Sequence, residues 1–182
     1  ANSNQVLMEF MGLHLPGSSF VAPNTPLRAA LTSEGARIVV GLSDLGSSYL
    51  PVSDILTEKA YVNGIVGLMA TGGSTNLLIH LIAMARASGI LLDWVDFQDI
   101  AEVVPLLTRI YPNGLADVNH FHAAGGLGLV VRELLGAGLL HDDTLTVAGR
   151  GLTHYTKEPK LIDGVLVWEE CARVSLNTKI IA

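Results

Sequence analysis

Residues 71–76 read Thr71-Gly72-Gly73-Ser74-Thr75-Asn76, and they organise the sequence on either side of them. The two glycines allow a tight backbone turn, and the three polar residues that follow carry oxygens that can cap a helix. Apolar residues at a helical spacing come next, at Leu77, Leu78, Leu81, Ile82 and Ala85. The stretch therefore predicts a loop that delivers backbone N–H groups to a helix N-terminus, which is a natural site for a small anion.

The composition is unusually apolar for a chain with no obvious membrane segment. Of 182 residues, 49% are hydrophobic and 15% are charged, whereas globular proteins average about 25% charged residues. No stretch approaches the roughly 18 apolar residues that would span a bilayer, because the longest candidate, residues 77–87, contains His80 and Arg86. We interpret the excess of apolar residues as surface that packs against another domain or a second subunit.

Charge and cysteine content restrict the possible partners. The net charge of −6 argues against nucleic acid or an acidic membrane as a partner, so an anionic substrate must be held by a local site. The single cysteine, Cys171, excludes an internal disulfide and is compatible with a reducing, cytoplasmic location. The chain starts at Ala1 and stops within a strand-like pattern at Ile180-Ile181-Ala182, so we expect an internal piece of a longer protein.

Apolar periodicity and capping residues predict a mostly helical chain that becomes rich in β-structure towards its end. Pro105 predicts a kink or a break within one helix, and Asp163-Gly164 predicts a hairpin turn. We place a domain boundary near residues 142–150, so that residues 1–143 are the helical part and residues 144–182 begin a β-rich domain. Helices are expected over residues 3–13, 26–45, 58–69, 75–88, 97–110 (capped by Asp96) and 118–135, with a short one after Pro51.

Four segments, in this order and at these separations, resemble the dihydroxy-acid/phosphogluconate dehydratase family. They are residues 1–5 (ANSNQ), 11–19 (MGLHLPGSS), 71–76 (TGGSTN) with His80-Leu81 behind it, and 122–126 (HAAGG) with Glu133-Leu134. The resemblance spans nearly the whole chain. It implies an α/β fold class, in which residues 1–143 are the mostly helical latter part of a large N-terminal α/β domain and residues 144–182 begin a β-rich C-terminal domain.

Four further segments are similar to the family members that act on phosphogluconate. They are residues 23–28 (PNTPLR), 111–114 (YPNG), 119–122 (NHFH) and 155–161 (YTKEPKL). This resemblance implies a hydro-lyase that removes water from 6-phospho-D-gluconate to give 2-dehydro-3-deoxy-6-phosphogluconate, a step of the Entner–Doudoroff route of sugar breakdown. It also implies a homodimer, in which a second subunit would cover apolar faces.

The family resemblance further implies an iron–sulfur cluster, of the 4Fe–4S type, held by cysteines. The nearest family cysteine would precede Ala1, and Cys171 matches none of the cluster cysteines. The serine proposed as the base in related enzymes would lie beyond residue 182. We therefore expect no metal ligand and no catalytic residue in this chain, and we expect the chain alone to be inactive. Removal of a 3-hydroxyl needs a Lewis acid on that oxygen and a base at C2, and this chain can supply only groups that hold the anionic ends of the substrate.

The candidates for contact with substrate or with the cluster edge are Gly72, Gly73, Ser74, Thr75, Asn76, His122 and Arg28. For the glycine loop, the alternative is an ordinary turn and helix cap. Arg28 could reach a phosphate, or it could form a surface ion pair. His120 and His122 would point about 200° apart on a helix, so we expect them to have structural or capping roles rather than to chelate a metal together. We expect His80, on an apolar helix face, to be a buried histidine.

Two other functions stay open. The first is dehydration of a different acid, such as a branched-chain dihydroxy acid or an unphosphorylated sugar acid, which Arg28 and residues 155–161 would distinguish if they lay near the phosphate. The second is a helical scaffold or interaction module without catalytic chemistry, which would predict no cysteine cluster and no hydroxy-acid binding in the full-length protein.

Overall fold

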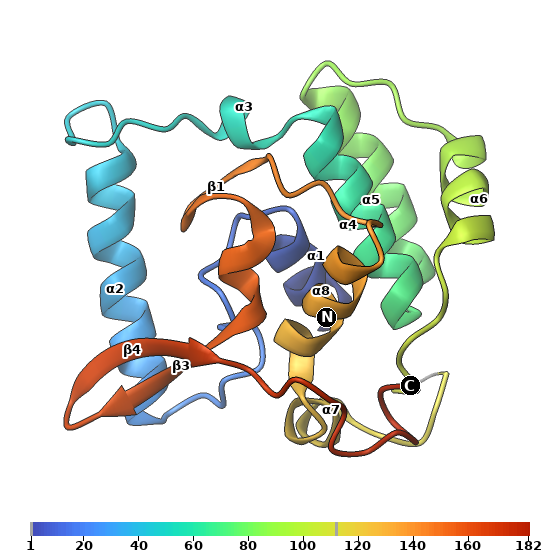
Figure 1. Ribbon diagram of the computed structural model, residues 1–182. Coiled ribbons are helices and arrows are strands. Elements are labelled where there is room, and N and C mark those ends of the chain that lie inside the picture. Colours follow the sequence, from blue (N-terminus) through green and yellow to red (C-terminus); the bar gives the residue numbers. More distant parts are fainter. Residues whose placement is uncertain (1, 112) are drawn as a thin grey trace.

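The computed structural model describes residues 2–111 and 113–182 (Figure 1). Ala1 and Pro112, which belong to two of the predicted motifs, lie outside the described residues. Helices dominate the described part up to residue 136, and two short antiparallel strand pairs follow. The helices are α1 (Asn2–Phe10), α2 (Pro26–Leu42), α3 (Val52–Ile55), α4 (Glu58–Thr71), α5 (Thr75–Ala87), α6 (Trp94–Val103), α7 (Val118–Ala123), α8 (Gly126–Gly136) and the 3₁₀-helix η1 (Leu152–Thr156); the strands are β1 (Leu145–Thr146), β2 (Gly149–Arg150), β3 (Lys157–Ile162) and β4 (Val165–Glu170).

Helix α1 lies at the centre of the molecule, against α4 and near α8 (Figure 1). Its apolar side chains divide between two cores, as its predicted helical periodicity allows. Val6 and Phe10 pack in a core with α7, α8 and η1, whereas Leu7 and Met11 pack in a core with α4, α5 and α6. A single nine-residue helix therefore joins the two halves of the interior.

Glycines of α4 allow the close approach of α1. A Cβ atom on Gly67 would lie 2.3 Å from the ring of Phe10, and one on Gly64 would lie 2.7 Å from Leu7. Asn63 of α4 is also buried, and its side chain pairs with both the N–H and the C=O of His141. The α1–α4 contact and the connection that follows α8 are thus fixed by α4.

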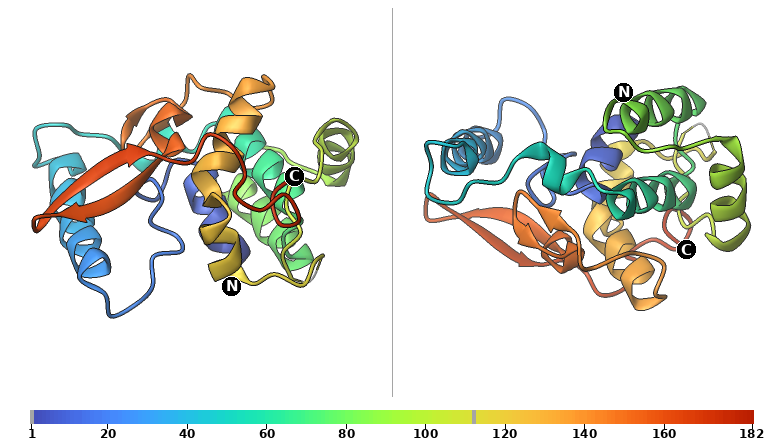
Figure 2. Two further views of the ribbon diagram at one scale, coloured as in Figure 1. Left: turned by 60° about the horizontal axis from the view of Figure 1, so that its bottom comes forward. Right: turned by 90° about the horizontal axis from the view of Figure 1, so that it is seen from above.

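Helix α2 stands apart from this body (Figure 2). Its predicted start is confirmed, because the side chain of Thr25 accepts the N–H of Arg28 and Pro26 begins the helix. It ends at Leu42, three residues before the predicted end at Leu45, and Leu31 is its only buried residue. Val39 and Val40 are 66% and 70% exposed, which is consistent with our interpretation that apolar surface of this chain packs against something else.

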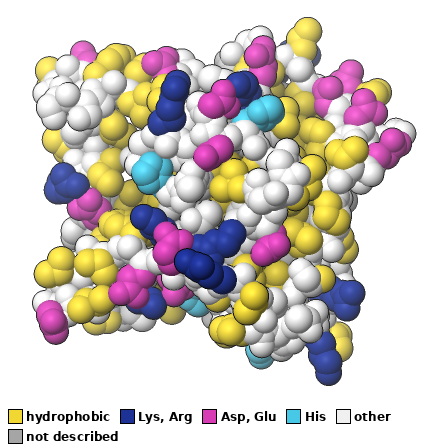
Figure 3. Space-filling model, viewed as in Figure 1, with side chains coloured by type: hydrophobic (Ala, Val, Ile, Leu, Met, Phe, Trp, Pro, Cys, Tyr) yellow, Lys and Arg dark blue, Asp and Glu magenta, His cyan; other side chains and the backbone are white. Residues whose placement is uncertain are grey.

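The predicted hairpin at Asp163-Gly164 is confirmed. Strands β3 and β4 pair in register from Lys157 opposite Glu170 to Ile162 opposite Val165. Both turn residues have positive φ angles, 48° and 79°, as a two-residue hairpin turn requires. Figure 3 shows acidic and basic side chains gathered over this hairpin, with hydrophobic side chains exposed over much of the same face.

The predicted change from helices to strands is confirmed, because the strands of the described residues all follow residue 144. Leu152 and Tyr155 of η1 nevertheless share one apolar core with Phe10 and Phe121. The domain boundary near residues 142–150 concerns the architecture of a longer protein and stays a prediction. No helix among the described residues is long and apolar enough to cross a membrane.

Three further predictions differ from the structure. The helix expected over residues 97–110 with Asp96 as its cap instead begins at Trp94 with Asp93 as its cap. It ends at Val103 because Pro105 forces Val104 into an extended conformation, so the break predicted at Pro105 is itself confirmed. The helix expected over residues 118–135 is divided into α7 and α8, with Gly125 between them at a φ angle of 133°. His80 is exposed rather than buried.

The fit between α1 and α4 generates a stability prediction. Replacing Gly67→Ala should lower the free energy of unfolding by about 1–3 kcal/mol, because the new methyl group overlaps the buried ring of Phe10. The matched control is Gly41→Ala in α2, where nothing lies within 4 Å of the new Cβ atom. That variant should gain about 0.5–1 kcal/mol from helix propensity. Urea unfolding followed by circular dichroism measures both, and equal effects of the two substitutions would contradict the packing described here.

Candidate functional site

The predicted glycine loop is a tight connection between α4 and α5. Gly72 ends α4 in the left-handed conformation, with φ 61° and ψ 47°. Ser74 is the N-cap of α5, and its Oγ accepts the N–H of Asn76 at 3.3 Å. Thr75 and Asn76 are already the first two residues of α5. The predicted turn followed by a helix cap is thus confirmed.

Side chains approach both glycines of this loop closely. Asn113 donates its side-chain N–H to the carbonyl of Gly72 at 2.7 Å, and a Cβ atom on Gly72 would lie 2.0 Å from the same nitrogen. A Cβ atom on Gly73 would lie 2.4 Å from Leu68. The N–H of Ser74 donates to Ser3 Oγ at 2.9 Å. The loop therefore joins α1, α4, α5 and the segment around Asn113.

These contacts use most of the N–H groups on which the expected anion site depends. The N–H groups of Gly72 and Gly73 donate to carbonyls of α4, that of Ser74 donates to Ser3, and that of Asn76 donates to Ser74 Oγ. A helix N-terminus attracts an anion through its unpaired N–H groups. Anion binding by residues 72–76 stays a prediction, and the donors available for it are few.

A cleft of about 620 Å³ opens beside this loop. We call it the Gly-Gly cleft. Hydroxyl-bearing and amide side chains alternate with apolar ones along it, and Asp117 is the only charged side chain among its described lining residues. The lining consists of Ser3, Val6, Phe20, Thr71, Gly72, Gly73, Ser74, Thr75, Ile110, Tyr111, Asn113, Ala116, Asp117 and Val118.

The loop of residues 12–21, which carries the predicted motif MGLHLPGSS apart from Met11, is held by side chains rather than by regular backbone pairing. We call it the clamped loop. Glu9 of α1 is 1% exposed, and its two carboxylate oxygens accept the N–H groups of Gly17 and Ser19, each at 2.8 Å. Burial raises the pKa of Glu9, whereas these hydrogen bonds and the nearby charge of Arg28 oppose that rise.

Three further side chains pair with carbonyls of the clamped loop. Arg28 donates to the carbonyls of Ser18 and Val21 at 2.5 and 2.7 Å. The buried hydroxyl of Tyr155 donates to the carbonyl of His14 at 2.8 Å, and the indole N–H of Trp168 donates to the carbonyl of Pro16 at 2.9 Å. The loop is thus fixed from α1, α2, η1 and β4 at once.

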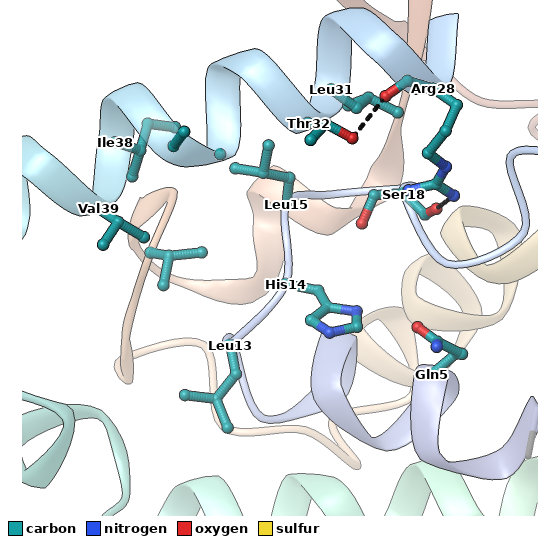
Figure 4. A pocket seen from close by; sticks show the side chains of 13 residues that line it. Gln5, Leu13, His14, Leu15, Ser18, Arg28, Leu31, Thr32, Ile38 and Val39 are labelled. Atoms are coloured by element: carbon teal, nitrogen blue, oxygen red, sulfur yellow. Dashed lines mark hydrogen bonds between the residues drawn. The ribbon is translucent and has the colours of Figure 1, made fainter. Parts of the chain in front are cut away.

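Arg28 and His14 border a pocket between the clamped loop and α2 (Figure 4). Its polar end is formed by Gln5, His14, Ser18 and Arg28, and the rest of its wall is mostly apolar. Burial lowers the pKa of His14, and the charge of Arg28 lowers it further, so His14 is neutral at pH 7. Among the described residues, Arg28 forms no ion pair and its guanidinium hydrogen bonds hold the loop, while its contact with a phosphate stays a prediction.

The two histidines of α7 have separate surroundings. His120 completes a capping box with Asp117, as the structural interpretation of this residue predicts. His122 is exposed and borders a narrow cavity that also touches Glu9, Gly17 and Cys171. Among the described residues, no group of three histidine, cysteine or acidic side chains could hold a metal ion.

The predicted site residues therefore lie in three places rather than in one. Gly72, Gly73, Ser74 and Thr75 line the Gly-Gly cleft, Arg28 borders the pocket beside α2, and His122 borders the cavity beside Glu9; Asn76 is exposed at the start of α5. All three places border α1 or the clamped loop. Sequence reasoning missed Ser3, Glu9, Tyr155 and Trp168; the one signal for Glu9 was an acidic residue within the apolar run Val6–Met11.

The amino-acid sequence of the chain also matches a known protein family. The sequence model of the family described as "Dihydroxy-acid/6-phosphogluconate dehydratase N-terminal" matches residues 1–155. This match covers most of the chain, including the clamped loop, the glycine loop and both histidines. The chain belongs to the dihydroxy-acid/6-phosphogluconate dehydratase family.

Individual relatives are similar over most or all of the chain. Phosphogluconate dehydratase of Escherichia coli K12 is 57% identical over 182 residues, and that of Pseudomonas aeruginosa is 56% identical over 181 residues. Dihydroxy-acid dehydratase of Metallosphaera sedula is 37% identical over 161 residues, which are 88% of this chain and 28% of that protein. The chain spans 30% of the length of the first two relatives.

The clamped loop generates a second stability prediction. Replacing Tyr155→Phe leaves the carbonyl of His14 without its donor, which should lower the free energy of unfolding by about 1–3 kcal/mol. The control is Tyr49→Phe, because Tyr49 is 61% exposed and surface substitutions usually change stability by less than about 0.5 kcal/mol. If urea unfolding gives the same stability for both variants, the Tyr155 hydrogen bond does not contribute as we describe.

Proposed function

We propose that this chain forms one wall of the substrate site in a hydro-lyase that removes water from 6-phospho-D-gluconate and yields 2-dehydro-3-deoxy-6-phosphogluconate. The observation that carries the proposal is the similarity over the full chain to proteins named phosphogluconate dehydratase, at 57% and 56% identity, against 37% for a dihydroxy-acid dehydratase. Because the chain spans 30% of those relatives, the activity is proposed for the longer protein.

In the proposed reaction, the residues of this chain bind the substrate and shape its site. Dehydration removes a proton from C2 and the hydroxyl from C3, and it requires a base and an acid placed at those atoms. We assign neither role to a residue of this chain. Gly72, Gly73, Ser74 and Thr75 would face the substrate from the Gly-Gly cleft, and the clamped loop would hold the surrounding wall rigid.

The residues present do not fit the iron–sulfur cluster that the family resemblance implies. Cluster ligation requires several thiolates, whereas Cys171 is the only cysteine and is 4% exposed. Burial raises the pKa of its thiol, which disfavours the thiolate, and its Sγ lies 3.4 Å from the carbonyl oxygen of Ala172. We therefore propose that any cluster, of the 4Fe–4S or another type, is held by cysteines outside this chain, and we route no step through it.

We further propose a cytoplasmic homodimer in which the rest of the protein and a second subunit cover the exposed apolar side chains of α2 and α6, with no nucleic acid or membrane as a partner. Val39, Val40, Trp94 and Val103 are each at least 59% exposed. Dehydration of another 2,3-dihydroxy acid is the second candidate, and it is favoured by the 37% identity to a dihydroxy-acid dehydratase.

An assay of the full-length protein tests the proposal. 6-Phospho-D-gluconate should yield a 2-oxo acid, measured by the consumption of a reduced nicotinamide cofactor with a coupled dehydrogenase, at a kcat/KM at least about tenfold above those for D-gluconate and 2,3-dihydroxyisovalerate. The 182-residue chain alone is the control and should be inactive. A full-length protein that prefers 2,3-dihydroxyisovalerate would support the second candidate, and one that converts none of the three acids would contradict both.

A further inference from the structure

The charge of the Gly-Gly cleft is the opposite of what an anionic group requires. Asp117 is the only charged side chain among its described lining residues. Hydrogen bonds from the backbone, chiefly the N–H of His120, lower the pKa of this carboxyl group, so it is negative at neutral pH. A phosphate or carboxylate in the cleft would meet this exposed charge, and the described lining residues include no lysine or arginine to offset it.

The uncharged groups of the cleft, by contrast, suit hydroxyl groups. Ser3 Oγ and Ser74 Oγ each accept a backbone N–H, from Ser74 and Asn76 respectively. In both cases the hydroxyl hydrogen stays available as a donor. Asn113 uses its N–H₂ group on Gly72 and retains its carbonyl oxygen as an acceptor, while Thr75 places a further hydroxyl on the wall. Donors and acceptors of this kind, closely spaced, complement a run of neighbouring hydroxyl groups.

We infer that the Gly-Gly cleft binds the neutral, hydroxyl-bearing part of its ligand and not an anionic end. The ligand class is a polyhydroxylated carbon chain, of which a sugar acid is one example. The inference rests on the proposed function, because a sugar-acid substrate supplies such a chain between its two anionic ends. It replaces the anion site expected from the glycine loop with a polyol site formed by Ser3, Ser74, Thr75 and Asn113.

Two ligands that share hydroxyl groups but differ in their anionic group test the inference. D-Gluconate carries a carboxylate, and D-glucitol 6-phosphate carries a phosphate and has no carboxylate to acidify C2, so it is not dehydrated. Thr75→Val removes one hydroxyl from the exposed first residue of α5 at nearly constant size. In the full-length protein it should raise the Kd of both ligands by the same factor, about three- to tenfold, and should leave weak binding of inorganic phosphate unchanged.

Asp117→Asn tests whether the negative charge of Asp117 lies beside an anionic group of either ligand. Asparagine caps a helix about as well as aspartate, so α7 should persist while the charge is removed. The Kd values of D-gluconate and D-glucitol 6-phosphate should change by the same factor, within about twofold. The matched control is Asp93→Asn, because Asp93 is also an exposed cap with a capping box and does not line the cleft; it should change neither Kd.

Isothermal titration calorimetry measures each Kd. The inference is overturned if Asp117→Asn tightens one ligand at least threefold more than the other, since that places an anionic group beside Asp117. It is also overturned if Thr75→Val affects only one ligand or neither. If the full-length protein nevertheless dehydrates 6-phospho-D-gluconate, the proposed function survives such a result. If the wild-type protein neither binds the two ligands nor dehydrates any sugar acid, the proposed function fails as well.

Discussion

The carboxylate of Glu9 is the interaction on which the rest of the structure depends. Burying a carboxylate costs several kcal/mol unless hydrogen bonds or charges compensate it. Here two backbone N–H groups and the nearby guanidinium of Arg28 offset part of this cost, although burial still leaves the pKa of Glu9 raised. Because both N–H groups come from the clamped loop, the compensation also fixes that loop on α1. Other elements then attach to it, through Arg28 of α2, Tyr155 of η1 and Trp168 of β4.

This arrangement explains how a helix with little buried surface can keep its place. Helix α2 buries only Leu31, so packing alone would hold it weakly. Helix α2 contacts β3 and β4, and Arg28 ties it to the clamped loop. The loop borders both the pocket beside α2 and the cavity beside His122. The three candidate places thus share one rigid border. The same border would transmit a disturbance of Glu9 to all of them.

The sequence predicts local features well, because their causes lie within a few residues. Thr25 and Ser74 cap the helices that follow them, and Asp163-Gly164 forms the expected turn, since side-chain caps and positive φ angles are local properties. The sequence predicts Asp96 as the cap of α6, whereas Asp93 is the cap in the structure. The side chain of each residue accepts the backbone N–H of the other, so their three-residue spacing fits either one as the cap.

The candidate site was less predictable because its contacts join distant residues. Ser3 pairs with Ser74, and Tyr155 pairs with the carbonyl of His14 across 141 positions. No periodicity or spacing encodes such pairs. The glycine loop was located correctly. Most of its N–H groups have partners nearby in the sequence, and that of Ser74 donates to Ser3, which only the fold brings close. Anion binding by this loop stays a prediction.

Hydrogen exchange of the clamped loop in the full-length protein tests the central claim most directly. Surface loops without regular pairing usually exchange their amide hydrogens rapidly, whereas amides in strong hydrogen bonds to buried groups are protected. If Glu9 holds the loop, Gly17 and Ser19 should exchange as slowly as amides within α4, and Glu9→Ala should abolish this protection. Rapid exchange at Gly17 and Ser19 in the wild-type protein would show that Glu9 does not fix this loop.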